Sequence, residues 1–548
     1  MEYTGILIIL AVCVLSFFYL EMKQISKFND RKDRLLFYTT SAIMLVGVVA
    51  RVVWLQYPYG INVDEAANGY DSWCLAHYGV DQYLYPYPVY LKSWGSGQTA
   101  LYAYLAAPFI KLCGLSAHVH RLPMAIISSF TVLFFYWSLR KTGANKLLVA
   151  TLVLMLALSP WHIMNGRWAL DCNIAPNLCL IGVCCILLGS HAISGRRLGF
   201  YVAGCISFVL TAYGYGVSWF MLPILYLGVF VLLFKRKKIE IKQAVICLGV
   251  TALVAFPLIL FAINVFFGQA AYQLGPITIP ELVKMRHDVT TLFGSDDVLG
   301  YISNNIRKGI FLLVWGTDGT PHNAMRFWGQ FYNVVGIPLI LYSFYIYIRQ
   351  RSFSLMDAIF LVWLISCLPI LLIVEIGVFH WNMIWIPLVY FSGKGMYLLI
   401  HKFKKLLIPV YAVIICFAGM FFYEYFNYYH PKQDGRLWFK ISGFEYGLQE
   451  PIDFIYSLDK VENRYFARRV NTIYCVLFYH PVSPYTFEGQ YNKTTIIGVD
   501  LDKEFFFDGN PIPHPKTAYL IPNDEAGNVP MSEYKIKRFD HYTVVWNE

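Results

Sequence analysis

Ionisable side chains are unusually dense between residues 57 and 119, where they lie among many aromatic residues. They are four carboxylates, a histidine and a lysine: Asp64, Glu65, Asp71, Asp81, His77 and Lys92. A carboxylate at a partly dehydrated surface has a raised pKa and can act as a general base. We therefore expect Asp64 or Glu65 to act as a general base that removes a proton from a hydroxyl acceptor. Alternatively, the pair adds negative charge to the start of a helix.

Lys92 precedes a Ser-Trp-Gly-Ser-Gly turn and a short apolar run. Its ammonium group is suited to binding the phosphate of a lipid held near the membrane surface. The alternative is a lysine that extends its charge from an apolar surface into water without a ligand.

Further polar residues lie in other connections between apolar runs. The segment SPWHIMNGRWALDCN contains His162, Arg167 and Asp171, where a short turn would suffice to join two spans. Such residues either pair with each other, as Arg167 and Asp171 could at a spacing of four, or face a cavity. Tyr70, Asp71, Asp171, His322 and His380 are further polar candidates for contact with a ligand.

The composition places these residues on a membrane protein. Of the 548 residues, 57% are apolar and only 14% are charged, which is too much apolar surface for a soluble core. The net charge of +10 comes from short basic clusters between apolar runs, so it indicates topology and not nucleic-acid binding. Most of the twelve cysteines lie inside apolar runs without metal-ligand spacing. We read the first apolar run as a retained helix.

Twelve apolar runs predict membrane-spanning helices. They are 4–20, 37–56, 120–139, 147–161, 174–191, 199–215, 217–234, 243–267, 331–348, 355–374, 383–400 and 406–423. Every second connection is rich in Lys and Arg and is therefore expected to be cytoplasmic. The run 99–113 is too short to span and is predicted to lie along the outer interface. Segments 57–119 and 268–330 and the tail then share the outer face.

Three regions follow from this pattern. Residues 1–36 are expected to be an extra span and a basic cytoplasmic loop, 37–423 a transmembrane catalytic domain, and 424–548 a small extracytoplasmic α/β domain. Within the tail, strands are predicted at Asn471–Phe478, Thr494–Val499 and Tyr542–Trp546, and a helix near Pro451–Leu458. The predicted fold class is an α-helical polytopic membrane protein with this additional domain.

Four features resemble the GT-C superfamily of polyprenyl-phosphate-sugar glycosyltransferases, especially bacterial relatives of protein O-mannosyltransferases and of the lipid A aminoarabinose transferase. The Asp64-Glu65 pair opens a long outer loop, Lys92 and GQTALYAYL follow it, Arg121-Leu122-Pro123 begins the next span, and SPWHIMNGRWALDCN resembles the second outer loop. The resemblance covers roughly residues 37–400.

The resemblance implies an inverting glycosyltransferase. Asp64 would be the general base, Glu65 would assist it or help to bind a divalent ion, and Lys92, with Arg167, would hold the donor phosphate. Contacts to the acceptor or sugar would come from Tyr70, Asp71, Asp171, His322 and His380. The partners would be a polyprenyl-phosphate-sugar donor and an extracytoplasmic glycan, glycolipid or protein acceptor. The expected location is a bacterial plasma membrane, with the active site and the tail outside. No cofactor is required with certainty, although Asp64 and Glu65 offer ligands for Mg²⁺, Mn²⁺ or Ca²⁺.

Two other functions remain open from the sequence. A flippase or transporter of lipid-linked glycans also suits twelve spans, although its ionisable residues would be expected near the midplane of the membrane. A surface-polysaccharide ligase or polymerase would use a diphosphate-linked donor and rely on arginines and histidines in a large outer loop. Arg286, His287 and His322 keep that reading open.

Overall fold

All twelve apolar runs form helices. The computed structural model describes residues 3–23, 30–93, 96–282, 291–319, 325–428, 444–467, 473–487, 495–496, 499–500, 506–507, 515–523, 526 and 533–547. Within these ranges, nine helices are long and apolar enough to cross a membrane. The prediction of a polytopic α-helical membrane protein is confirmed.

The chain divides into two compact units. Unit 1 comprises Met1–Leu55, Leu122–Ile263 and Met285–Asn427, and unit 2 comprises Gln56–Arg121, Asn264–Lys284 and Tyr428–Glu548. Unit 1 is therefore almost entirely the helical bundle. Unit 2 gathers the first outer loop, part of the later outer segment and the tail.

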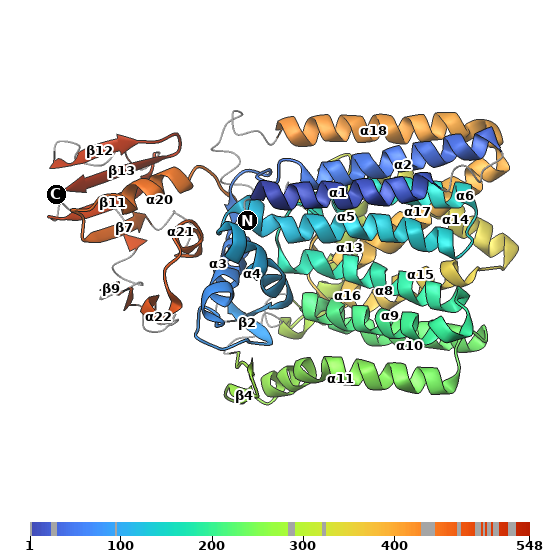
Figure 1. Cartoon of the computed structure of the whole chain (residues 1–548), viewed down its shortest axis with the longest axis horizontal. Coiled ribbons are helices and arrows are strands. Elements are labelled where there is room, and N and C mark those ends of the chain that lie inside the picture. The colour runs from blue at the N-terminus through green and yellow to red at the C-terminus, as the bar shows by residue number, and fades with distance from the viewer. Residues whose placement is uncertain are drawn as a thin grey trace. The chain divides into compact units, whose positions relative to one another are not determined.

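The long helices of unit 1 run side by side (Figure 1), with α8 packed on α9, α14 on α17, and α6 on both α17 and α2. The α-helices are α1 (Tyr3–Met22), α2 (Arg31–Val52), α5 (Ala117–Lys141), α6 (Lys146–Ala157), α7 (Pro160–Asn165), α8 (Ile174–His191), α9 (Ser194–Gly214), α10 (Leu222–Lys235), α11 (Ile241–Phe266), α13 (Val298–Trp315), α14 (Asn333–Gln350), α15 (Leu355–Ser366), α16 (Leu368–Ile373), α17 (Asn382–Lys402) and α18 (Leu407–Tyr428). Short 3₁₀ turns are η2 (Asp171–Asn173), η3 (Gly216–Phe220), η4 (Leu292–Gly294) and η5 (Lys404–Leu406).

Some runs differ in detail from the prediction. The run 147–161 is divided into α6 and α7, because Pro160 begins a new helix and the Ser159 side chain accepts a hydrogen bond from the His162 N–H. The 18-residue helix α13 lies within the segment 268–330, for which no helix was predicted. Its apolar residues include Leu299, Ile310 and Val314, which are exposed on its surface.

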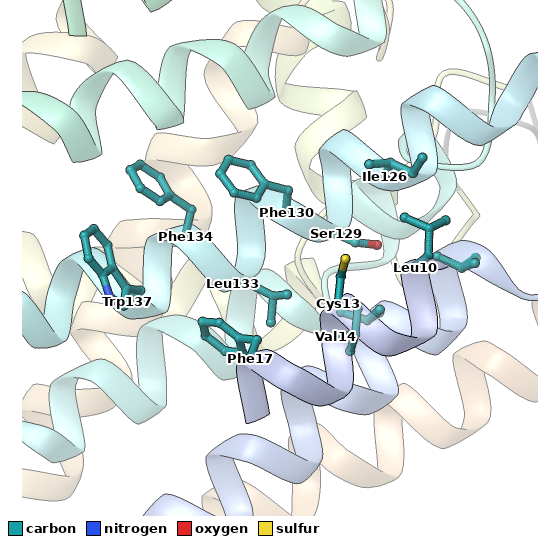
Figure 2. A pocket seen from close by; sticks show the side chains of 12 residues that line it. Leu10, Cys13, Val14, Phe17, Ile126, Ser129, Phe130, Leu133, Phe134 and Trp137 are labelled. Carbon is teal, nitrogen blue, oxygen red and sulfur yellow. The ribbon is translucent and has the colours of Figure 1, made fainter. Parts of the chain in front are cut away.

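Unit 1 has an apolar groove of about 470 Å³ on its surface. Figure 2 shows Phe17 of α1 beside Leu133 of α5, and Cys13 of α1 near Ser129 of α5. Only a small part of α1 is buried in the described structure. Such a groove is suited to lipid chains, because it offers almost no hydrogen-bonding groups.

Unit 2 is built from short elements around α3. Its elements are β1 (Ile61–Asn62), α3 (Val63–Tyr78), β2 (Tyr90–Ser93), β3 (Ser96–Thr99), α4 (Leu101–Cys113), β4 (Tyr272–Leu274), β5 (Ile277–Ile279), β6 (Phe444–Glu445), α20 (Gln449–Tyr456), β7 (Asn463–Ala467), α21 (Ile473–Tyr479), α22 (Pro484–Phe487), β8 (Thr495–Ile496), β9 (Val499–Asp500), β10 (Phe506–Phe507), β11 (Thr517–Pro522), β12 (Lys535–Arg538) and β13 (Tyr542–Asn547). The 13-residue α4 packs on α3.

The tail contains a mixed five-stranded sheet in the order β10-β7-β11-β13-β12. Strands β10, β7 and β11 are parallel, whereas β13 is antiparallel to both β11 and β12. Helix α20 matches the helix predicted near Pro451–Leu458 and packs on β11 and β13. Strand β13 likewise matches the strand predicted at Tyr542–Trp546.

The strand predicted at Asn471–Phe478 is wrong: the described part is helix α21. Residues Ile473 to Phe478 are all buried in a core that also contains Ala66, Ala67 and Tyr70 of α3. A short apolar run in a sequence is consistent with a strand and with a buried helix. Here the segment is a helix that packs against α3. The tail therefore does not form its core alone. It shares one with the helix that carries Asp64.

Candidate active site

Asp64 lies in the first turn of α3. The Asn62 side chain accepts a hydrogen bond from the Asp64 N–H at 3.0 Å, which caps the helix start. The helix ends at Gly79, whose φ of 70° suits glycine at a left-handed C-cap. Asp64 is partly exposed and Glu65 is buried. The helix dipole favours the negative charge of both residues, as the alternative sequence reading expected, but their environments differ.

Glu65 forms a fully buried ion pair with Arg121. Arg121 Nε donates to Glu65 Oε1 at 2.6 Å and Arg121 Nη2 donates to Glu65 Oε2 at 2.8 Å. The same guanidinium donates to the carbonyls of Pro58 at 2.7 Å and Gly60 at 2.9 Å. Arg121 thus ties the chain before α3 to the first turn of the helix. This geometry favours a positioning role for Glu65.

Lys92 lies on β2 opposite Gly97 of β3. Its ammonium donates to the Tyr85 hydroxyl at 3.0 Å and to Glu281 Oε1 at 3.3 Å. It also lies 5.7 Å from the ring centroid of Tyr83. Burial alone would lower the pKa of Lys92, but the hydrogen bonds and charges of Tyr85 and Glu281 outweigh it and raise that pKa. Lys92 is therefore a fixed positive charge.

The hairpin that carries Lys92 contacts the start of α3. Gln98 Nε2, one residue beyond Gly97 on β3, donates to the Asp64 carbonyl at 3.4 Å. The later outer segment also joins this region, because the Val89 N–H donates to the Thr278 carbonyl at 3.0 Å and the Thr278 hydroxyl donates to the Pro86 carbonyl. The structure thus brings together Asp64, Lys92 and the segments that the sequence placed on one face.

A row of buried polar side chains continues along α3 from Asp64. Asn68 and Asp71 follow at spacings of four and seven residues, which places them on the same helical face. Asp71 Oδ1 accepts from the Gln82 N–H at 2.9 Å, and Asp71 Oδ2 accepts from Gln82 Nε2 at 3.0 Å. Asp81 Oδ1 accepts from backbone N–H groups in the same turn.

Asp71 on α3 and Asp81 in the turn after it both have raised pKa values. Burial, and then the charge of Asp81, raise the pKa of Asp71 well above its usual range despite the opposing hydrogen bonds from Gln82. Burial raises the pKa of Asp81 to about 7, although backbone hydrogen bonds and the charge of Lys92 oppose the shift. Desolvation is thus the main cause in both cases.

Several buried polar atoms on α3, in the turn that follows it and on the β2–β3 hairpin lack a protein partner among the described residues. They are both polar atoms of the Asn68 side chain, Asp81 Oδ2, Gln82 Oε1, Ser93 Oγ and Gln98 Oε1. Buried polar atoms are normally hydrogen-bonded. These atoms can therefore form hydrogen bonds with water or with the hydroxyl groups of a ligand.

The other predicted site residues have different surroundings. Tyr70 is fully buried in the core shared with the tail and donates to the Val482 carbonyl at 2.8 Å. In unit 1, Arg167 donates to the carbonyls of Ala50, Val53 and Trp54 at the end of α2. It thereby satisfies carbonyls that a helix end leaves without partners. These contacts favour structural roles for both residues.

Asp171 and His380 also belong to unit 1. Asp171 begins the 3₁₀ turn η2 and is partly buried. His380 Nδ1 donates to the Glu375 carbonyl at 3.0 Å. The nearby Val378 N–H donates to Asp318 Oδ2 at 2.8 Å, so the Asp318 loop contacts this turn. His322, Arg286 and His287 lie outside the described residues.

His162 lies in a buried hydrogen-bond network of unit 1. Its Nδ1 is 2.6 Å from Arg51 Nη2 and its Nε2 is 3.0 Å from Asn177 Oδ1. Arg51 also donates to the carbonyls of Gly47 and Ala157. The sequence offered no signal for this pairing, because Arg51 lies 111 residues earlier.

The residues around Asp64 do not fit a divalent cation site. Both Glu65 oxygens accept hydrogen bonds from Arg121, so this carboxylate is already paired with a buried guanidinium. In the described part of the chain, no group of three or more His, Cys, Asp or Glu side chains is placed to hold a metal ion. A hard divalent cation takes several oxygen ligands.

No protein-family model and no curated protein matches the sequence. The structure nevertheless resembles that of ArnT from Cupriavidus metallidurans, with a TM-score of 0.56 and 14% identity over 92% of this chain and 97% of ArnT. The same values hold for ArnT bound to undecaprenyl phosphate. The chain has the fold of ArnT. The polytopic helical fold with an additional C-terminal domain, expected from the sequence, agrees with this likeness.

A second solved structure has the same general fold. The oligosaccharyltransferase of Archaeoglobus fulgidus, in its complex with Zn and sulfate, matches with a TM-score of 0.51 and 15% identity over 81% of this chain. The present chain spans only 61% of that enzyme, whereas it spans nearly all of ArnT. The ArnT-like fold therefore accounts for both the helical bundle and the tail.

Proposed function

We propose that this protein is an inverting membrane glycosyltransferase. It moves a sugar from a polyprenyl-phosphate-linked donor to a hydroxyl acceptor on the extracytoplasmic side. The observation that carries the proposal is the pairing of an ArnT-like fold with a partly exposed Asp64, which the Lys92 hairpin contacts through Gln98. The donor assignment is supported by ArnT, which binds undecaprenyl phosphate in one of its crystal structures.

The reaction needs one base and one stabilised leaving group. The Asp64 carboxylate accepts the proton of the acceptor hydroxyl, and the acceptor oxygen forms a bond to the anomeric carbon of the donor. The bond from that carbon to the phosphate oxygen breaks, and its electron pair leaves with the lipid phosphate. Lys92 stabilises the departing negative charge. One displacement inverts the anomeric centre.

Two features prepare the site for this step. The Glu65–Arg121 pair fixes the first turn of α3, so Asp64 needs little reorganisation. Asn68, one turn further along the same face, and Gln98 present buried polar atoms that lack protein partners among the described residues. We assign them to the hydroxyl groups of the donor sugar.

The test is transfer of label from the lipid. The purified protein is mixed with radiolabelled polyprenyl-phosphate sugars and membrane extract, and label leaving the lipid fraction is measured. Asp64→Asn should abolish transfer, because an amide cannot accept the proton. Asp459→Asn is the matched control, since Asp459 is an exposed aspartate of the tail. Transfer by Asp64→Asn at the parent rate would contradict the proposed base.

A further inference from the structure

Unit 2 contains a polar cavity of about 340 Å³, which the proposed chemistry does not use. Three stretches of chain form its wall: the segment before β1, the start of α5, and the tail. The lining includes Tyr59, Gly60, Tyr446, Gln449, Glu450 and Asp540.

Aromatic rings hold each other in place on one side of this cavity. The Tyr59 and Tyr446 ring centroids lie 5.8 Å apart, with planes at 69°. Tyr446 also meets His541 edge to face at 5.3 Å. Such contacts restrain the rings. The cavity therefore offers a stiff aromatic surface that a ligand can bind without ordering flexible side chains.

Carboxylates and amides complete the lining. Glu450 and Asp540 are exposed, and both act on the Tyr446 hydroxyl: burial first, then the charge of Asp540, and also those of Tyr59 and Glu450, raise the pKa of Tyr446. Gln56 and Gln449 add amide groups. These side chains supply both donors and acceptors beside the aromatic surface.

This lining selects among ligand classes. Among the residues described around the cavity there is no lysine or arginine, and two are carboxylates, so phosphate and other anions would be repelled. A purely apolar ligand would leave the polar groups without partners. A sugar has apolar C–H faces that fit against aromatic rings and hydroxyl groups that carboxylates and amides bind. An uncharged glycan therefore fits the lining best.

The cavity also lies close to Asp64 along the chain. Gly60 lines it, and the Gly60 carbonyl accepts a hydrogen bond from Arg121, which holds Glu65 beside Asp64. Gly60 and Asp64 are four residues apart in the chain, so their Cα atoms are at most about 14 Å apart. The wall of the cavity and the proposed base therefore belong to one short stretch of chain.

We propose that this cavity is the acceptor subsite and that it binds an uncharged glycan through Tyr446, Glu450 and Asp540. The assignment of the ligand as an acceptor rests on the proposed glycosyl transfer. Glycan binding itself does not, because it requires neither a donor nor Asp64.

The first experiment measures binding without any donor. The full-length protein in detergent is applied to an array of bacterial surface glycans and unglycosylated peptides, and Kd is then determined for the glycan with the strongest signal. Tyr446→Ala should weaken this Kd by about tenfold or more, because it removes the aromatic surface. Glu450→Gln should weaken it by about three- to tenfold. Tyr446→Phe keeps the ring and should retain most of the affinity.

Matched controls lie elsewhere in the tail. Tyr485→Ala removes an exposed tyrosine and Glu462→Gln an exposed glutamate, and neither lines the cavity. Both should bind like the parent. The inference is overturned if the parent binds no glycan on the array, if it binds peptides instead, or if Tyr446→Ala and Glu450→Gln bind as tightly as the controls.

A second readout separates this inference from the proposed function. In the transfer assay, Glu450→Gln should raise KM for the acceptor and leave kcat unchanged, because Glu450 contributes binding alone. Absence of transfer by the parent would contradict the glycosyltransferase proposal while the array result still decides glycan binding. Transfer with an unchanged acceptor KM in Glu450→Gln would contradict the acceptor subsite alone.

Discussion

We expect the buried Glu65–Arg121 ion pair to stabilise α3 strongly. Glu65→Gln leaves the Arg121 charge buried without its carboxylate, and breaking a buried ion pair from one side costs about 3–5 kcal/mol. At 1.36 kcal/mol for each factor of ten, this corresponds to roughly 150- to 5,000-fold. Amide hydrogen exchange in peptides covering Val63–Tyr78 should accelerate by that factor, because opening of α3 then competes with a less stable closed state.

The same experiment contains its own controls. Glu462→Gln changes an exposed carboxylate of the tail and should leave exchange in α3 unchanged. Replacing both partners, with Glu65→Leu and Arg121→Met, removes the buried charges together and should recover part of the protection. Exchange in α3 within tenfold of the parent in Glu65→Gln would refute the reasoning that this pair fixes the helix start.

Other predictions concern the surrounding site. Lys92→Gln should lower kcat/KM by about 10²–10³-fold in the transfer assay, because it removes charge from the leaving phosphate; an unchanged value would exclude that role. Asp71 and Asp81 have raised pKa values when folded, so their contribution to stability is fully present below an unfolded pKa of about 3.9 and is lost as the pH rises through their folded pKa values, which for Asp81 is about 7. Thermal scans should give a higher Tm at pH 5 than at pH 8, with a smaller difference in Asp71→Asn. Gly69→Ala would place a Cβ 2.5 Å from Phe478 and should destabilise the contact between α3 and α21 by about 1–3 kcal/mol, detectable as faster amide exchange in both helices.

The sequence predicts the helices of unit 1 well because hydropathy alone places them. A helix in lipid satisfies its own backbone hydrogen bonds, so an apolar run of sufficient length has few alternatives. The 18-residue α13 was missed because its sequence includes Asn304, Asn305, Arg307 and Lys308 and does not read as an apolar run.

The site was predictable only in part. The motifs located Asp64 and Lys92, and the structure brings their segments together through Gln98. They could not identify the partner of Glu65, because Arg121 is 56 residues away and the pairing depends on the tertiary fold. The sequence likewise could not show that Arg167 donates to the carbonyls at the end of α2, because these partners are distant in the chain. Arg167 was therefore predicted to bind a phosphate.

The core shared by α3 and α21 has a consequence for biosynthesis. Tyr70 of α3 donates to the carbonyl of Val482, 412 residues later, and Phe478 packs on the same core. Contacts between such distant residues form only after the intervening chain has been made. Tyr70 therefore leaves the ribosome 412 residues before Val482, and the helix that carries the proposed base reaches its final packing long after it has been made. A chain interrupted before α21 would leave α3 without the core residues that the tail supplies, so α3 would lack its final packing until the tail had been made.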